Sequence, residues 1–174
     1  ILIIMKKVLI IFVLLFSSSL LAEDISDFQI EGMSIGDSLL DYMSKEEIIK
    51  EIKSNKYMYE YLTDEYGEVY LYRNFETYDV VSFIVKPKDK DYIIFAIRGI
   101  LEFEKLDDCL KKQNEIVKFF EQIFIDIEIE SNSFDHPIDP TGRSKRYKKH
   151  INLYSEDQIE ATCDEFETNL KIKN

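Results

Sequence analysis

The longest apolar run of the chain lies near its beginning. Met5 and two lysines precede an uncharged stretch over 8–16, and three serines and a short Leu-Leu-Ala sequence ending at Ala22 follow it. A basic start, a short apolar core and a small residue at the cut are the pattern of a secretory signal peptide. The alternative, a transmembrane anchor, needs about 20 apolar residues, and this run is shorter. We therefore predict that residues 1–22 are upstream residues plus a signal peptide, and that 23–174 form a single mature domain.

Two later segments have the apolar spacing of an amphipathic helix. In the first, Ser44 and Glu47 have the spacing of a capping box, and an isoleucine stripe follows them. The second begins at Asp107 or Asp108, whose negative charge suits the positive end of the helix dipole. Its apolar face consists of Cys109, Ile116, Phe120 and Ile123. Both segments are therefore predicted to pack one face against a core.

Alternating and β-branched stretches predict six strands, three after each helix. Their expected ranges are Val69–Arg73, Tyr78–Lys86, Tyr92–Phe103, Ile127–Glu130, His150–Tyr154 and Gln158–Asp164. Gly99 inside the third strand indicates a bulge or a close backbone approach, and residues 131–149 indicate a long polar connection. This order predicts an α+β fold, in which two αβββ units form one curved antiparallel sheet with two helices on one face.

The charge of the chain excludes some classes of partner. The net charge is −12, and removal of Lys6 and Lys7 with the leader brings it to −14. Such a field repels nucleic acid and anionic lipid headgroups, so we expect neither as a general partner. After signal cleavage we also expect no membrane span, and the absence of a cysteine just after the apolar run argues against a lipid anchor.

The two cysteines of the chain, Cys109 and Cys163, both belong to the exported part. In an oxidising compartment an even pair predicts one disulfide. The chain-entropy model gives such a bridge a stabilisation of about 4 kcal/mol, less any strain. A metal site is the less favoured reading, because no other ligand lies next to either cysteine. We expect the protein in the periplasm or outside the cell.

Two segments carry a resemblance to known proteins. IEGMSIGDSLLDYMSKEEI and DDCLKKQNEIVKFFEQIF resemble a group of uncharacterised exported proteins of small-genome marine alphaproteobacteria, over most of the mature chain and including both cysteines. A weaker similarity, at the level of the fold, is to β-lactamase-inhibitor-protein-like and SmpA/OmlA-like assembly lipoprotein domains. The matching residues are Gly32, Met33, Ser34, Ser44, Glu46, Glu47 and Ile48. Such folds generally act by binding proteins, so the resemblance implies a binding module, but without the lipid-bearing cysteine.

The long polar connection contains the candidate functional residues. Asp135, His136, Asp139 and His150 are weak candidates for a zinc-type site, although their spacing matches no established ligand motif. A basic island over 143–150 could bind an anionic partner or envelope polymer, but the favoured interpretation is a solvated loop tip entering a strand. Its possible ligand-binding residues are Arg143, Lys145, Arg146 and Tyr147.

Six tyrosines form the other unusual feature, at positions 57, 59, 61, 66, 70 and 72. They fit an amphipathic recognition surface, or a sheet with one buried aromatic face. We find no G-x-S-x-G elbow, P-loop, dinucleotide fingerprint or EF-hand loop. The sequence therefore favours an exported, non-catalytic binding protein without a cofactor, whose partner is an unknown protein or envelope component. The alternative is a small periplasmic hydrolase or metal-dependent enzyme that uses the loop over 135–150.

Overall fold

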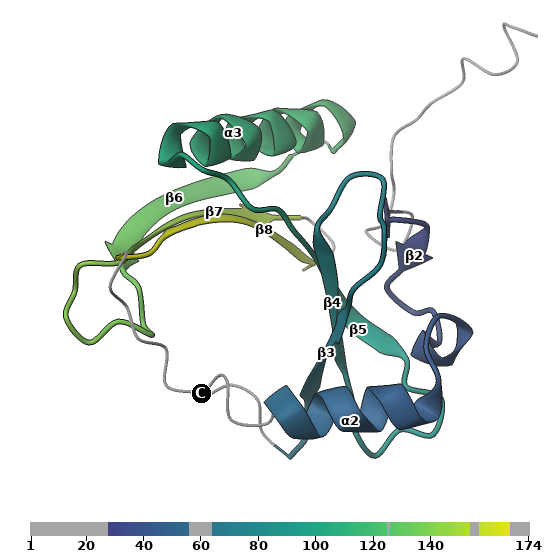
Figure 1. Cartoon of the computed structure of the whole chain (residues 1–174). Coiled ribbons are helices and arrows are strands. Elements are labelled where there is room, and N and C mark those ends of the chain that lie inside the picture. Colours follow the sequence, from purple (N-terminus) through teal and green to yellow (C-terminus); the bar gives the residue numbers. More distant parts are fainter. Residues whose placement is uncertain (1–27, 56–63, 125, 154–156, 168–174) are drawn as a thin grey trace, which may run out of the picture. The chain divides into compact units, whose positions relative to one another are not determined.

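The chain folds into two compact units of helices and antiparallel strands, which confirms the α+β class (Figure 1). The computed structural model describes residues 28–55, 64–124, 126–153 and 157–167. One unit spans Asp24–Lys105, and the other contains Leu106–Asn174. The predicted signal peptide lies outside the described residues. Within the described ranges, no helix is long and apolar enough to cross a membrane.

The first unit is built on a three-stranded meander in the order β3-β4-β5. Its elements are β1 (Gln29–Ile30), β2 (Met33–Ser34), the short 3₁₀ helix η2 (Leu39–Asp41), α2 (Lys45–Asn55), β3 (Gly67–Leu71), β4 (Val80–Val85) and β5 (Ile94–Ile100). The first three predicted strands are therefore confirmed, with bounds that differ by at most three residues.

Helix α2 begins at the predicted capping box. The amide of Glu47 donates to Ser44 Oγ at 3.3 Å, and the amide of Ser44 donates to Glu47 Oε2 at 2.9 Å. These bonds satisfy amides that the first helical turn leaves without a partner. Hydrogen bonds from the Ser44 side chain and amide also hold the pKa of Glu47 below its usual value. The start of α2 is thus determined by local sequence.

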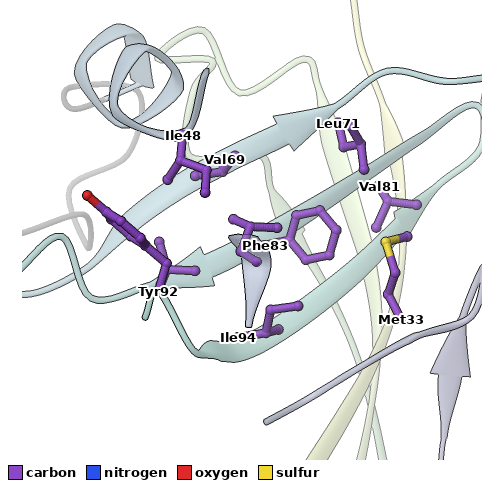
Figure 2. Packing of buried hydrophobic residues seen from close by; sticks show 10 residues of the cluster. Met33, Ile48, Val69, Leu71, Val81, Phe83, Tyr92 and Ile94 are labelled. Atoms are coloured by element: carbon purple, nitrogen blue, oxygen red, sulfur yellow. The ribbon is translucent and has the colours of Figure 1, made fainter. Parts of the chain in front are cut away.

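The core of this unit lies on one face of the meander (Figure 2). Alternate β4 residues point into it, because successive strand side chains project to opposite faces. Ile48 reaches it from α2 and Met33 from β2, and both are buried. The complete buried cluster is Met33, Leu39, Ile48, Val69, Leu71, Val81, Phe83, Val85, Tyr92 and Ile94.

Helix α2 also covers the free edge of β3. The Asn55 side-chain amide donates to the carbonyl of Glu68 at 3.3 Å, and the amide of Tyr70 donates to Glu51 Oε2 at 3.4 Å. These bonds use outward-facing backbone groups that could otherwise pair with another chain. The edge of this sheet is therefore protected by its own helix.

Gly99 confirms the predicted close approach. A Cβ atom built at this position would lie 2.4 Å from the ring of Tyr78, closer than any side chain tolerates. The bulge of this strand pair occurs elsewhere, where the register shifts between Ile84 and Val85. Glycine is needed at position 99 because the tyrosine ring packs directly on the strand backbone.

The second unit repeats the helix-and-three-strand order. Its elements are α3 (Leu106–Ile123), β6 (Glu128–Asp135), β7 (Lys145–Asn152) and β8 (Gln158–Glu165), and β7 is the central strand. Strands β6 and β7 are longer than predicted and take up most of the expected polar connection. The polar residues of this connection show no alternation of apolar and polar positions, because neither face of the two strands is mainly apolar there.

The predicted disulfide joins the helix of this unit to its last strand. Cys109 lies in the first part of α3 and Cys163 in β8, and their Cα atoms are 5.9 Å apart. Further along α3, the buried Gln113 side chain donates to the carbonyls of Tyr147 and Ala161, at 2.9 and 2.8 Å. A covalent bond and polar contacts therefore hold α3 on the sheet.

The sheet arrangement differs from the expected one. Strands β3-β4-β5 and β6-β7-β8 form two separate sheets, and β1-β2 form a third. The repeated αβββ order is present, but one helix packs on β3 and the other mainly on β8. The order of strands along the chain does not determine whether β5 and β6 pair. Pairing uses backbone groups at the strand edges, and the pattern of apolar side chains does not report on these groups.

Candidate functional site

The basic island lies on β7, in the middle of the second sheet, and in the turn that precedes it. Arg143 belongs to the turn, whereas Lys145, Arg146 and Tyr147 are the first residues of the strand. The sequence placed these residues in a loop tip entering a strand. The structure instead gives them fixed positions between two neighbouring strands.

Alternation along β7 divides its side chains between two faces. Tyr147 lies opposite Cys163, and Cys163 is bonded to α3. Arg146, Lys148 and His150 therefore project to the face opposite the helix. We call this face the polar face, and its residues are Arg146, Lys148, His150 and Asn152 on β7, Asp164, Thr162, Glu160 and Gln158 on β8, and Phe134, Asn132, Glu130 and Glu128 on β6.

Carboxylates of the flanking strands pair with three cations of β7, Lys145, Arg146 and Lys148, whereas Lys149 donates to Asn114. Arg146 donates from Nε and Nη2 to the two oxygens of Asp164, both at 2.6 Å. The remaining pairs are Lys145 with Asp135, Lys148 with Glu160, and Arg143 with Glu167 at 3.9 Å. A free anion would have to displace these carboxylates. The predicted anion-binding role of the island remains a prediction, on a surface of mixed charge.

His136 connects the turn to this ion pair. It is 4% exposed, and its Nδ1 accepts a hydrogen bond from the amide of Ile138 at 3.2 Å. Nε2 lies 3.3 Å from Asp164 Oδ2 and 2.9 Å from Arg146 Nη2. The ring therefore fixes the turn against β7 and β8.

Asp139 organises the turn itself. Its carboxylate accepts from the amide and hydroxyl of Thr141, at 2.9 and 2.6 Å, and from the amide and hydroxyl of Ser144, both at 2.8 Å. The hydrogen bond from the Thr141 hydroxyl, followed by those of Ser144, holds the pKa of Asp139 well below its usual range. Four donors on one carboxylate give this turn a defined shape.

The weak metal candidates have separate surroundings. Asp135 pairs with Lys145, His136 with the turn and Asp164, and His150 Nδ1 is buried without a hydrogen-bond partner. In the part of the chain that the structure describes, no three His, Cys, Asp or Glu side chains form a group that could hold a metal ion. The proposed donors are thus not gathered into one site.

Ser144, the serine of the turn, does not have the hydrogen bonds of a catalytic serine paired with a histidine. Ser144 is fully buried, its hydroxyl donates to Asp139, and it accepts from the amide of Glu167 at 3.0 Å. A catalytic nucleophile must also be reachable by its substrate, and this hydroxyl belongs to a fully buried residue. The hydrogen bonds of this turn therefore account for its shape, and they give no support to the alternative of a hydrolase.

Three exposed apolar side chains surround this polar turn. Phe134 lies opposite Arg146, Ile138 donates its amide to His136, and the Phe166 ring packs 4.8 Å from the His136 ring. They are 42%, 36% and 49% exposed, respectively. We call Phe134, Ile138 and Phe166 the apolar corner. No pattern in the sequence indicated it, because Phe134 and Ile138 stand isolated among polar residues.

The tyrosine-rich segment belongs to the other unit. Tyr66 packs on Phe95 with ring centroids 5.3 Å apart, and Tyr70 stacks with Tyr72 at 6.4 Å. Tyr72 is 69% exposed. The tyrosines at 57, 59 and 61 lie outside the described residues. The expectation of a recognition surface remains open for this segment.

No protein-family model, curated protein or solved structure matches the chain. The resemblances inferred from the sequence therefore stay predictions.

Proposed function

We propose that this protein is an exported, non-catalytic binding protein of the cell envelope. It contacts an envelope protein or polymer through the polar face and the apolar corner of its second unit. The charged side chains of the polar face can orient a partner as it approaches. The apolar corner supplies apolar surface whose burial on binding is favourable.

The observation that carries the proposal is the apolar corner. Exposed aromatic side chains are common anchors of protein interfaces, especially beside arginine. Here Phe134 lies opposite Arg146, whose guanidinium group is held by Asp164. Phe166 packs on His136, which in turn contacts Arg146. Because His136 and Asp139 fix the turn, little conformational entropy would be lost when a partner binds.

The disulfide supports the export of the protein. Bridges of this kind persist in oxidising compartments, whereas cytosolic thiols are kept reduced. Cys109 and Cys163 join the two ends of the second unit and leave no free thiol among the described residues. A periplasmic or secreted location fits both this bridge and the predicted signal peptide.

A capture experiment with matched variants tests the proposal. The oxidised protein is immobilised, exposed to cell-envelope extract, and its retained proteins or polymers are quantified by mass spectrometry. Replacement of the two corner aromatics, Phe134→Ser with Phe166→Ser, should reduce the retained partner about tenfold or more, as expected for loss of interface anchors.

Phe103→Ser is the control for this experiment. Phe103 is 40% exposed, close to the 42% of Phe134, but it belongs to the other unit. This variant should retain the same partner as the wild-type protein. Equal retention by the corner variant, or no component retained above a blank surface, would refute the proposed role.

A further inference from the structure

Strand β6 lies at an edge of the second sheet. Among the described residues, β7 is its one neighbour. Its register with β7 runs from Glu128 to Asp135 without a shift, and nearly all of its residues are exposed. An edge of this length offers a row of backbone groups to another strand.

The hydrogen-bond pattern identifies which of these groups point outward. The amide of His136 donates to the carbonyl of Ser144 at 2.8 Å, in the same register as β6 and β7. Residues of an antiparallel pair alternate between bonded and non-bonded positions. The bonded positions of β6 are therefore Glu128, Glu130, Asn132 and Phe134. The outward-facing amides and carbonyls belong to Ile129, Ser131, Ser133 and Asp135.

Within the described part of the chain, the usual protections of an edge strand are missing from the middle of β6. Bulges, prolines, lysines or a covering element normally discourage pairing with another chain. Positions 131–134 contain none of these residue types and no charge, and the register there is regular. In the first unit, by contrast, α2 occupies the backbone groups of the β3 edge.

The side chains beside this edge indicate the character of a partner. Glu128 and Glu130 project from β6 to the polar face, and Phe134 projects to the same face near its other end. An added strand would place its alternate side chains next to them. Two basic side chains and one apolar side chain would complement this row.

We propose that β6 binds an extended, basic segment of another protein as a fourth strand of the second sheet. The segment runs antiparallel to β6, with an apolar residue beside Phe134 and lysine or arginine beside Glu130 and Glu128. Strand β7 already pairs in this way on the inner side of β6, with Lys148 and His150 opposite Asn132 and Glu130. The inference rests on the proposed binding role and specifies the partner.

A second copy of the chain is the less suitable occupant. Each copy carries a net charge of −12, so two copies repel one another before their edges meet. A basic segment is attracted by the same field, and its backbone can pair with the outward groups of Ser131 and Ser133.

A short peptide probe tests this inference on the full oxidised chain. The probe is acetyl-Phe-Thr-Thr-Thr-Lys-Thr-Lys-Thr-amide, and the matched control peptide has glutamate in place of both lysines. Fluorescence anisotropy of labelled peptides should show saturable binding of the lysine peptide and about tenfold weaker binding of the glutamate peptide.

Proline substitution separates edge pairing from simple charge attraction. Ser131→Pro with Ser133→Pro removes two outward amides and no bond to β7, so it should abolish most of the binding. The matched variant Ser131→Ala with Ser133→Ala keeps both amides and should bind as the wild type does. If circular dichroism shows that the proline variant is unfolded, the variant Glu128→Lys with Glu130→Lys tests the docking edge in its place. That variant must bind the lysine peptide more weakly than the wild type does.

Each outcome has a defined meaning. Equal binding by the proline and alanine variants, or no binding by the wild type, would overturn β6 as the docking edge. The capture experiment with the corner variant would then still decide whether the protein is a binding protein. A dimer seen by analytical ultracentrifugation that disappears in the proline variant would overturn the proposed partner in favour of a second copy.

Discussion

Arg146 on β7 holds both carboxylate oxygens of Asp164 on β8, with two donor–acceptor distances of 2.6 Å. The two side chains are 27% and 24% exposed, so water screens this pair less than an isolated surface pair. Asp164 also lies beside the Nε2 atom of His136. This one carboxylate therefore links the β7–β8 pair to the turn that carries the apolar corner.

Removal of that carboxylate should weaken the second unit. We expect Asp164→Ala to lower the free energy of unfolding by about 1 to 2 kcal/mol, because Arg146 and His136 both lose a partner. Urea unfolding followed by circular dichroism measures the change. Glu115→Ala, which removes an exposed partner 3.8 Å from Lys112 on α3, should have a smaller effect. Equal effects of the two variants would contradict the linking role of Asp164.

Loss of the disulfide should have the largest effect on stability. The bridge closes a loop between positions 109 and 163, for which chain entropy gives about 4 kcal/mol of stabilisation. Cys109→Ser with Cys163→Ser should therefore unfold at a much lower urea concentration than the oxidised chain. A reducing agent should lower the midpoint of the wild type and leave that of the variant unchanged. A wild-type midpoint that does not respond to reduction would show that the bridge adds little.

Substitution of Gly99 should expose its contact with Tyr78. A methyl group at position 99 would lie 2.4 Å from the tyrosine ring, so Gly99→Ala should cost about 1 to 3 kcal/mol. The double variant Gly99→Ala with Tyr78→Ala should lose less than the sum of the two single variants, because the clash is then removed. Thermal or urea unfolding of all four proteins gives the coupling energy, and strict additivity would disprove the contact.

The phenol of Tyr42 should titrate late. Its hydroxyl donates to Asp37 Oδ2 at 2.7 Å, and this hydrogen bond, with burial and the nearby charges, raises the pKa of Tyr42 to about 12. The raised pKa stabilises the folded state below the ordinary value of 10.0, and this contribution is lost as the pH rises toward 12. Burial also raises the pKa of Tyr78, so the late phenolate absorbance should be smaller in Tyr42→Phe than in the wild type, while Tyr72→Phe should keep all of it. Equal late absorbance in the two variants would contradict this assignment.

Local signals in the sequence predicted some features well. Ser44 and Glu47 form their capping box because both groups lie within one helical turn. The pairing of Cys109 with Cys163 was determined once export was inferred, since two cysteines allow a single intramolecular bridge. These features depend on few residues and need no knowledge of the remaining fold.

Features that depend on polar pairing between distant residues were not predictable. Strands β6 and β7 extend through a stretch whose cross-strand partners are mostly polar or charged on both faces, so no apolar alternation marks them. The turn around Asp139 depends on four hydrogen bonds, and the role of His136 depends on Asp164, which lies 28 positions along the chain. The positions of the apolar corner residues around His136 and Arg146 depend on these contacts.

The bridge between α3 and β8 also determines how the second unit would respond to an extracellular protease. A single cut in the exposed turn near Pro140 would leave two pieces that remain covalently joined, because Cys109 lies before the cut and Cys163 after it. The nicked protein would migrate as one species without reductant and as two with it. A broken backbone would therefore not release either piece while the bridge stays intact.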